Sequence, residues 1–485
     1  MVRRWTCLLA LTACGRSGSE PAAPAEPVDS TPPTASTASP TGSTGATAAT
    51  GDSGPVPTAH TGAPSTASTA STAHTADSAD PTDTATSPDE GLYPDVPYDC
   101  SKGVPAGPFV GTPVAGRVSA MPGNAPAEKT IGQLEQVFTF HDAMPTGVTV
   151  TETGRIFVNY PRWGDDVPFT VGEIRDGKVV AYPDAAFNRE DPKAPAKGLI
   201  SVQSVVADGQ GRVWLLDTAA PNFAAPKAGG AKLVAVDLAS NKIVKTLVFP
   251  ANVILPSTYV NDMRFDFRTG KEGTVYVTDS SVSGPGAIIV MDIASGKATR
   301  RLSGAQSTSV DPDFVPVVEG QAALITKGPD GKAKTLGVAS DGIALSADGK
   351  TLYFCPLSSR HLYSVPTALL RDPNVSEAQL AAAVKDLGEK GASDGLEADA
   401  NGAVYAGDYE HNGIRKRLAD GSWQTIVHDP RVLWPDTLSV GPDGYLYFTA
   451  NQLQRQAGFH DGKDLREKPY SLLRVKIDAA PAPTR

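Results

Sequence analysis

The sequence predicts an all-β fold, a six-bladed β-propeller, from one repeated spacing and from the strands at its two ends. In six stretches a polar residue precedes a glycine by eight positions, and a short apolar run follows the glycine. The six pairs are Thr146/Gly154, Gln203/Gly211, Asp262/Gly270, Asp341/Gly349, Asp394/Gly402 and Asp436/Gly444. A unit that recurs every few dozen residues is typical of repeat architectures, and six hairpin units of this size indicate a propeller.

The second observation concerns closure of the ring. One strand-like stretch, residues 133–140, precedes the first unit, and another, residues 470–477, follows the last. If the first stretch is the outer strand of the last blade, both stretches are accounted for and two exposed sheet edges are removed. We therefore expect a propeller that is closed by pairing of its N- and C-terminal strands.

Within a unit the pattern predicts four short strands. The clearest unit has apolar and β-branched runs at residues 395–399, 403–407, 413–418 and 422–427. Turns that contain Asn-Gly or Asp-Gly separate these runs, and both dipeptides are hairpin signals.

Two insertions interrupt the repeated pattern. Residues 303–339 form a long connection, and residues 366–387 include two stretches that look helical. Because long loops on a rigid scaffold are where function concentrates, we expect both insertions to cover one face of the ring.

The chain begins with a segment typical of export. Arg3 and Arg4 precede an apolar run that is too short to span a bilayer and is typical of a signal peptide. Residues 11–14, Leu-Thr-Ala-Cys, resemble the lipobox of bacterial lipoproteins. This resemblance implies a lipoprotein signal peptide over residues 1–14, a lipidated Cys14 and a lipid anchor in the bacterial envelope, at the outer membrane or cell surface. An ordinary cleavage site with an incidental cysteine is the alternative.

A polar segment separates this leader from the folded domain. Residues 15–91 contain no Leu, Ile, Met or aromatic residue, so they cannot bury enough apolar surface to offset the entropy of ordering. We expect a disordered linker over residues 15–92 and the propeller over residues 93–482.

Charge and cysteine content narrow the class of partner. A net charge of −10 argues against nucleic acid, and we expect a monomer that touches the membrane only through its anchor. Cys100 and Cys355 stand in an export context that permits a disulfide, and a buried thiol at Cys355 is the alternative. The sequence has no cysteine or histidine pattern typical of a zinc site.

The repeated spacing predicts an acidic site at one end of the channel. Strand A of each unit starts where strand B ends, because the two form a hairpin, so both positions lie on the same face. The expected ligand-binding residues from these positions and their neighbours are Asp262, Asp436, Asp217, Asp279, Asp408, Trp163, Tyr409 and Asn451.

So many carboxylates near one axis repel each other unless a cation or hydrogen bonds offset the charge. A divalent cation such as Ca²⁺ prefers several oxygen ligands, and an organic ammonium is favoured by carboxylates with aromatic walls. The structural alternative is that each aspartate caps a turn or accepts backbone N–H groups at a strand end.

Nucleophilic catalysis has no support in the sequence. There is no Gly-x-Ser-x-Gly elbow, phosphate-binding loop or His-Glu-x-x-His helix. His361 and His411 are candidates for acid–base chemistry or for anchoring their loops. An aspartate that acts as a general base on water beside a metal is the mechanism that these residues support.

Several motifs carry a family resemblance. Residues 341–349 (DGIALSADG) precede residues 352–360 (LYFCPLSSR), and the chain also has Asn261-Asp262 and Trp434-Pro435-Asp436. Together they resemble the major royal jelly/yellow protein family over about residues 133–477. The resemblance implies a secreted six-bladed propeller with a pocket at the channel mouth. Some insect members bind biogenic amines and others are linked to the conversion of melanin precursors, so it implies a small-molecule ligand such as an amine.

A more distant similarity is to the senescence-marker/gluconolactonase family. Its pattern implies a divalent metal in the channel, with Gln203, Asn261, Asp341 and Asp394 around it and Asp394 acting also as the base. Gln203 stands where that family has Glu, and Asp341 stands where it has Asn. These departures keep oxygen ligands but redistribute the charge.

Three hypotheses follow. The first is a lipid-anchored propeller that binds a small cationic or metal-coordinated ligand at its acidic mouth. The second is a metal-dependent hydrolase of lactones or esters that uses Asp394 as the base. The third is an envelope scaffold whose propeller holds another protein.

Overall fold

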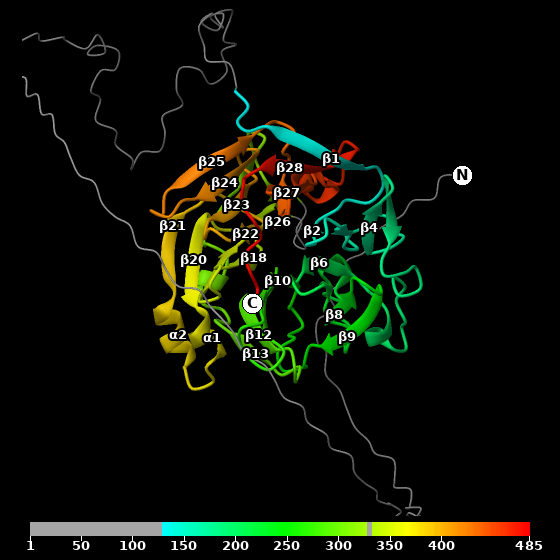
Figure 1. Ribbon diagram of the computed structural model, residues 1–485. Helices are drawn as coiled ribbons and strands as arrows, with labels where there is room; N and C mark the ends of the chain where they lie inside the picture. The colour runs from blue at the N-terminus through cyan, green and yellow to red at the C-terminus, as the bar shows by residue number, and fades with distance from the viewer. Residues whose placement is uncertain (1–128, 327–331) are drawn as a thin grey trace, which may run out of the picture. The chain divides into compact units, whose positions relative to one another are not determined.

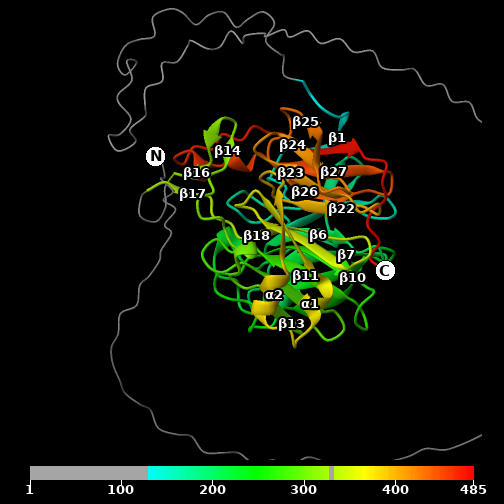
Figure 2. The same cartoon turned by 90° about the vertical axis from the view of Figure 1, so that its left-hand side faces the viewer.

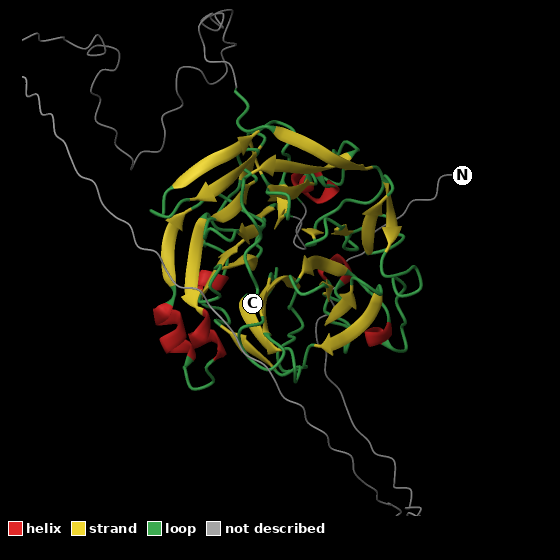
Figure 3. Cartoon of the chain, viewed as in Figure 1, coloured by secondary structure: helices red, strands yellow, loops and turns green. Residues whose placement is uncertain are grey.

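The structure is a computed structural model that describes residues 129–326 and 332–485. These residues form six four-stranded antiparallel sheets arranged in a ring, with few helices (Figures 1 and 3). The prediction of an all-β, six-bladed propeller is therefore confirmed. The predicted signal peptide with Cys14, the linker over residues 15–92 and Cys100 lie outside the described residues.

Each of the first three blades is a meander of four strands that starts at the channel. Blade 1 contains β2 (Val148–Val150), β3 (Ile156–Asn159), β4 (Val171–Arg175) and β5 (Lys178–Ala181). Blade 2 contains β6 (Val202–Ala207), β7 (Arg212–Asp217), β8 (Lys232–Asp237) and β9 (Lys242–Val248). Blade 3 contains β10 (Val260–Asp266), β11 (Thr274–Asp279), β12 (Ala287–Asp292) and β13 (Ala298–Arg301).

The next two blades repeat this order. Blade 4 contains β18 (Ser340–Leu345), β19 (Thr351–Pro356), β20 (His361–Pro366) and β21 (Lys385–Glu389). Blade 5 contains β22 (Leu396–Ala398), β23 (Val404–Asp408), β24 (Gly413–Arg417) and β25 (Trp423–His428). The four strands predicted within residues 393–427 are thus confirmed.

Blade 6 is composite and closes the ring. Its inner strands are β26 (Pro435–Val440), β27 (Tyr445–Ala450) and β28 (Tyr470–Lys476), and its outer strand is β1 (Leu134–Phe140). β1 pairs antiparallel with β28, from Leu134 opposite Val475 to Phe140 opposite Tyr470. The predicted pairing of the two end strands is confirmed.

The turn between the first two strands of each blade explains the repeated glycine. All six glycines of the spacing have a positive φ between 72° and 84°. Side chains with a Cβ rarely adopt this left-handed conformation, whereas glycine does so without steric cost. The glycine marks the turn, and the polar residue eight positions earlier marks the start of the inner strand.

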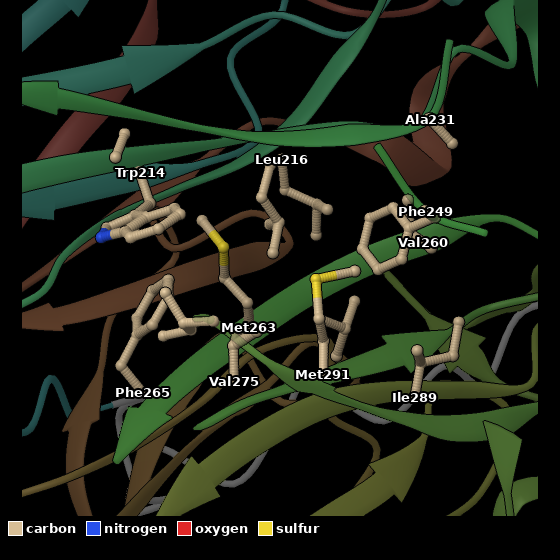
Figure 4. Close-up of a cluster of buried hydrophobic side chains, with 14 of the residues drawn as sticks. Trp214, Leu216, Ala231, Phe249, Val260, Met263, Phe265, Val275, Ile289 and Met291 are labelled. Atoms are coloured by element: carbon tan, nitrogen blue, oxygen red, sulfur yellow. The ribbon is translucent and has the colours of Figure 1, made fainter. Parts of the chain in front are cut away.

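The core lies between the faces of neighbouring blades. Figure 4 shows the cluster between blades 2 and 3, in which Trp214 and Leu216 of β7 face Met263 and Phe265 of β10. Met291 of β12 packs into the same cluster, and all five side chains are almost fully buried. Apolar burial of this kind contributes roughly 1.5–3 kcal/mol for each large side chain.

The two insertions lie in different places on the ring, and the second lies at its outer rim beside blades 3 and 4 (Figure 1). The first connects β13 to β18 and contains η4 (Gln306–Thr308), β14 (Val317–Val318), β15 (Gln321–Ala322), β16 (Leu324–Ile325) and β17 (Lys334–Thr335). The second contains α1 (Thr367–Arg371) and α2 (Glu377–Ala383), and Thr367 bonds to the carbonyls of Gly349 and Lys350 in a turn between inner strands. The expectation that both cover one face is therefore wrong, because the second connects strands at the end of the blade where those turns lie.

Four short 3₁₀ helices lie in three further connections. They are η2 (Pro195–Lys197), η3 (Pro221–Phe223), η5 (Leu453–Arg455) and η6 (Ala457–Phe459). Within the described ranges, no helix has both the length and the apolar character that a membrane span requires.

The C-terminal tail crosses the end of the channel opposite to β14–β17 (Figures 1 and 2). The backbone of Ala480 accepts a hydrogen bond from Ala400, and that of Thr484 accepts one from Phe267. The Thr484 hydroxyl donates to the carbonyl of Asp208, so the tail joins the turns of blades 5, 3 and 2. It closes a small cavity of about 90 Å³ in the channel, and the open mouth is at the other end.

Candidate functional site

A cavity of about 490 Å³ occupies the channel mouth where the inner strands begin. Its floor contains Gln203, Asn261, Asp341, Asp394 and Asp436. Its walls combine aromatic side chains with aliphatic side chains of the first insertion and of the loop after β27, and the exposed Lys334 also lines the cavity. The main wall residues are Trp163, Phe223, Tyr259, Ile325, Leu336, Val338, Leu357, Leu453 and Phe459.

Bulges at the start of the inner strands aim the floor residues into the cavity. The register of β6 shifts between Val202 and Ser204, so Gln203 has no direct partner on β7. Equivalent shifts occur in β10, β18 and β26, at the positions of Asn261, Asp341 and Asp436. A bulge inserts a residue whose side chain leaves the normal alternation, and proteins use it to re-aim side chains near sites.

Each of the three floor carboxylates accepts a hydrogen bond from a neutral side chain. Asn261 Nδ2 donates to Asp341 Oδ2 at 2.6 Å, Trp434 Nε1 donates to Asp394 Oδ2 at 2.8 Å, and Asn451 Nδ2 donates to Asp436 Oδ2 at 2.7 Å. These donors fix one oxygen of each carboxylate, and Thr437 Oγ1 donates to the other oxygen of Asp436 at 3.2 Å. None of the three carboxylates forms an ion pair with a cationic side chain in the described part of the chain.

Burial without a counter-ion raises the pKa of all three carboxyl groups. Burial and the charges of Asp394 and Asp436 raise the pKa of Asp341 well above its ordinary value. Burial raises the pKa of Asp394 to about 6, although bonds from the Trp434 indole and the neighbouring Asp341 carboxyl lower it. Burial and the charge of Asp394 raise the pKa of Asp436 well above its ordinary value. The floor therefore favours a bound proton or another cation.

An aromatic wall stands on the opposite side of the cavity. Phe223 stacks on Tyr259 with ring centroids 4.5 Å apart, and Trp163 stacks on Phe223 at 5.1 Å. Trp163 Nε1 donates to the Tyr259 hydroxyl at 2.9 Å, and that hydroxyl donates to Gln203 Oε1 at 2.8 Å. This chain of bonds holds the wall and the Gln203 amide in one arrangement.

The two halves of the ring thus differ in chemistry. Blades 4, 5 and 6 contribute the carboxylates of Asp341, Asp394 and Asp436. Blades 1, 2 and 3 contribute neutral amides and the aromatic wall. A ligand with a cationic end and a flat apolar body fits this division, with its cation toward blades 4–6.

The structure brings together six of the residues predicted from sequence and leaves six outside the cavity lining. Those in the lining are Trp163, Gln203, Asn261, Asp341, Asp394 and Asp436. Those outside it are Asp217, Asp262, Asp279, Asp408, Tyr409 and Asn451.

The carboxylates at the ends of the second strands bond within their own blades. Asp217 forms an ion pair with Lys232 at 2.6 Å and accepts the backbone N–H groups of Ile200 and Ser201. Asp279 forms an ion pair with Arg300 at 2.6 Å, and Asp408 contacts His411 at 2.9 Å. We do not include these three in the candidate site, because their oxygens serve the blade rather than the cavity.

Asp262 lies deeper in the channel than the floor. It accepts Ser204 Oγ at 2.7 Å and pairs with Arg264 at 2.9 Å. Because the turn of the third unit is longer, the eight-residue spacing from the glycine predicts Asp262 as its site residue. In the structure, Asn261 occupies the position equivalent to Asp341.

Two other predicted residues support the floor from behind. Tyr409 stacks on Trp434 with ring centroids 4.1 Å apart, and both are fully buried. Asn451 orients Asp436, as described above. The candidate acid–base histidines do not line the cavity, since His361 pairs with Asp386 and His411 is largely exposed.

The floor does not provide a good donor set for a divalent metal. Ca²⁺ takes six to eight oxygen ligands, yet Gln203 Oε1 is engaged by Tyr259 and one oxygen of Asp341 by Asn261. Within the residues that the structure describes, no group of three or more His, Cys, Asp or Glu is arranged to hold a metal ion. We derive no metal-dependent step from this site.

Sequence reasoning missed several lining residues. Tyr259 stands two positions before Asn261, and this proximity to a strand start is a signal that points to it. Phe223, Leu336 and Phe459 come from connections outside the repeated unit, so no periodic signal reports them. Cys355 is a buried free thiol.

Comparison with protein families gives one match, to the family described as major royal jelly protein, over residues 200–484. The chain is 26% identical over 230 residues to major royal jelly protein 1 of Apis mellifera, which covers 45% of this chain and 49% of that protein. It is 26% identical over 251 residues to protein yellow of Drosophila erecta, covering 49% and 43%. The chain thus spans about half the length of these curated relatives, or less.

Two solved structures illustrate the likeness in fold. A calcium-binding regucalcin from Agrobacterium tumefaciens is 15% identical with a TM-score of 0.44, covering 72% of this chain and 98% of that chain. A gluconolactonase from Xanthomonas campestris is 14% identical with a TM-score of 0.42, covering 73% and 99%. Neither likeness bears on the chemistry of the site.

Proposed function

Because the chain belongs to the major royal jelly protein family, we propose that it is a binding protein whose channel-mouth cavity takes a small organic cation. The ammonium group lies among Asp341, Asp394 and Asp436, and the apolar body lies against Trp163, Phe223 and Tyr259. The match covers only about half the length of these relatives, or less, so the proposal rests on this cavity and not on their properties.

One observation carries the proposal: three buried carboxyls share a cavity floor without a counter-ion in the described part of the chain. Burying ionised carboxylates without a cation costs several kcal/mol, roughly, for each group. An ammonium restores charge balance through charge-assisted hydrogen bonds. Aromatic faces stabilise the same cation by about 0.5–2 kcal/mol, and the cavity of about 490 Å³ is far larger than a metal ion requires.

The test is binding of phenethylammonium against its uncharged analogue phenethyl alcohol, by calorimetry and by melting temperature. We expect the amine to bind and to raise the melting temperature, and the alcohol to do neither. Asp394→Asn removes one floor carboxylate and should weaken amine binding at least tenfold, whereas Asp348→Asn, in an exposed turn, is the matched control. Stabilisation by Ca²⁺ alone, with no response to amines, would contradict the proposal and favour a metal site.

A second candidate, a hydrolase of lactones or esters, is favoured by one observation. A carboxyl whose pKa is about 6 can act as a general base near neutral pH. The binding proposal predicts no turnover of a lactone and ester panel. Turnover that Asp394→Asn abolishes, without change in the Asp348→Asn control, would establish the hydrolase instead.

We further propose that binding takes place outside the cytoplasm, on a lipid-anchored and monomeric protein. The support is the lipobox-like sequence that ends at Cys14 and the polar composition of residues 15–91. Expression of the full chain in a bacterial host should give a membrane-associated, fatty-acid-labelled product. Cys14→Ala should give an unlabelled product, and equal labelling of the two would overturn the anchor.

A further inference from the structure

The Gln203 amide is a neutral group held in one orientation at the edge of the acidic floor. Its side chain is almost fully buried and lines the cavity. Its Oε1 accepts the Tyr259 hydroxyl proton at 2.8 Å. In the described part of the chain its Nε2 has no hydrogen-bond partner, and it is not among the polar atoms sealed from solvent.

The bonds behind Gln203 determine which end of the amide faces the cavity. Trp163 Nε1 can only donate, so the Tyr259 oxygen accepts that bond and the hydroxyl proton goes to another acceptor. Gln203 Oε1 is that acceptor. The amide nitrogen is thereby turned toward the cavity, with two N–H groups to donate.

The rest of the floor presents acceptors. Asn261 uses its Nδ2 to bond Ser280 and Asp341, which leaves its carbonyl oxygen for the cavity. Asp341, Asp394 and Asp436 add carboxylate oxygens. Gln203 is on blade 2 and Asp394 is on blade 5, which are opposite each other in a ring of six blades (Figure 1).

We propose that Gln203 is a specificity-determining residue that donates a hydrogen bond to an ether, hydroxyl or carbonyl oxygen at the end of the ligand remote from its ammonium. This inference rests on the proposed cation-binding function and adds the second functional group of the ligand. It also replaces the sequence expectation that the Gln203 oxygen is a metal ligand, because that oxygen already accepts the Tyr259 hydroxyl.

The experiment uses two cations of matched size, para-methoxyphenethylamine and para-ethylphenethylamine. The methoxy oxygen accepts a hydrogen bond and donates none, and the ethyl group does neither. The parent protein should prefer the methoxy compound by about tenfold in Kd, which corresponds to about 1.4 kcal/mol, because the ethyl compound leaves the buried N–H without a hydrogen-bond partner.

Two variants make the test specific to the amide. Gln203→Met keeps the length of the side chain without the N–H groups and should bind both amines equally. Tyr259→Phe keeps the aromatic wall but frees the amide to rotate, and should reduce the preference to about threefold. Melting temperatures in the absence of ligand show that each variant is folded.

The possible outcomes distinguish failure of the inferred role of Gln203 from failure of the proposed cation-binding function. If the parent binds both amines with equal Kd, or if Gln203→Met keeps the preference, the role of Gln203 is wrong and the cation site stands. If neither amine binds the parent, the cation site fails and the inference fails with it.

Discussion

Two sets of buried aspartates lie near the channel mouth, and they differ in what balances their charge. Asp217 and Asp279, at the ends of β7 and β11, each form an ion pair of 2.6 Å with a lysine or arginine of the same blade. Asp341, Asp394 and Asp436, at the starts of the inner strands, have only neutral donors. The first set joins strands within a blade. The second set lowers stability, as is typical of functional sites, and under our proposal a bound cation balances its charge.

The largest effect is expected from breaking a pair in the first set. Lys232→Met leaves the Asp217 carboxylate buried without a cation, and both side chains are fully buried. We expect the free energy of unfolding to fall by about 3–5 kcal/mol, measured by urea denaturation.

The matched control removes both charges. Asp217→Asn combined with Lys232→Met should recover much of the lost stability, because no unpaired charge remains. Lys245→Met, which breaks an exposed pair with Glu272, should change stability by less than about 1 kcal/mol. A Lys232→Met variant as stable as the parent would mean that Asp217 does not depend on its partner.

The second set should make stability fall as pH rises. Well below pH 4 the Asp394 carboxyl is protonated in both the folded and the unfolded chain. Between that pH and about 6 the unfolded chain releases the proton while the folded chain keeps it, because the folded pKa is about 6. The contribution to the free energy of unfolding should decrease by on the order of 3 kcal/mol across this window.

Comparison with Asp394→Asn isolates this contribution. Urea titrations from pH 4 to pH 8 should show a flatter profile for the variant, which should be more stable than the parent at pH 7. Asp279→Asn should instead be less stable than the parent at pH 7, since it leaves Arg300 buried without its partner. Parallel profiles of the parent and Asp394→Asn would contradict the assignment.

The smallest effect concerns the donor behind Asp394. Trp434→Phe removes the indole N–H that lowers the pKa of Asp394, so the carboxyl should ionise at a higher pH. Amine affinity should fall about threefold at pH 6 and be almost unchanged at pH 8, as measured by calorimetry.

Tyr409→Phe is the control for packing. It keeps the ring that stacks on Trp434 and removes only the hydroxyl that bonds to the carbonyl of Leu357. An equal loss of affinity at both pH values in Trp434→Phe would indicate damage to the stack rather than a change in ionisation.

The fold was predictable because it depends on local turn chemistry. Each glycine of the spacing occupies a turn that requires a positive φ, so the sequence reports the start of every inner strand. The same spacing located Gln203, Asp341, Asp394 and Asp436 on the floor. In the third unit, whose turn is longer, the spacing points to Asp262, one residue after the floor residue Asn261.

The difference between the two sets of aspartates was not predictable from the spacing. Arg300, on the outer strand of the blade, forms the ion pair with Asp279. No repeated spacing in the sequence relates these two residues. Lys232 stands directly opposite Asp217 on the next strand, and a lysine at the start of an otherwise apolar strand was a usable sign. The part of the cavity wall that includes Leu336 and Phe459 comes from irregular connections.

The composite sixth blade has a consequence for folding during synthesis. β1 must wait for β28, because the contacts between Leu134 and Val475 join two ends of the domain. Until β28 has left the ribosome, the earlier blades stand as an open arc with unpaired edges. Long sequence separation slows folding and exposes such edges to aggregation. Closure of this ring is therefore a late step of folding, and the nascent chain is most exposed just before β28 becomes available to β1.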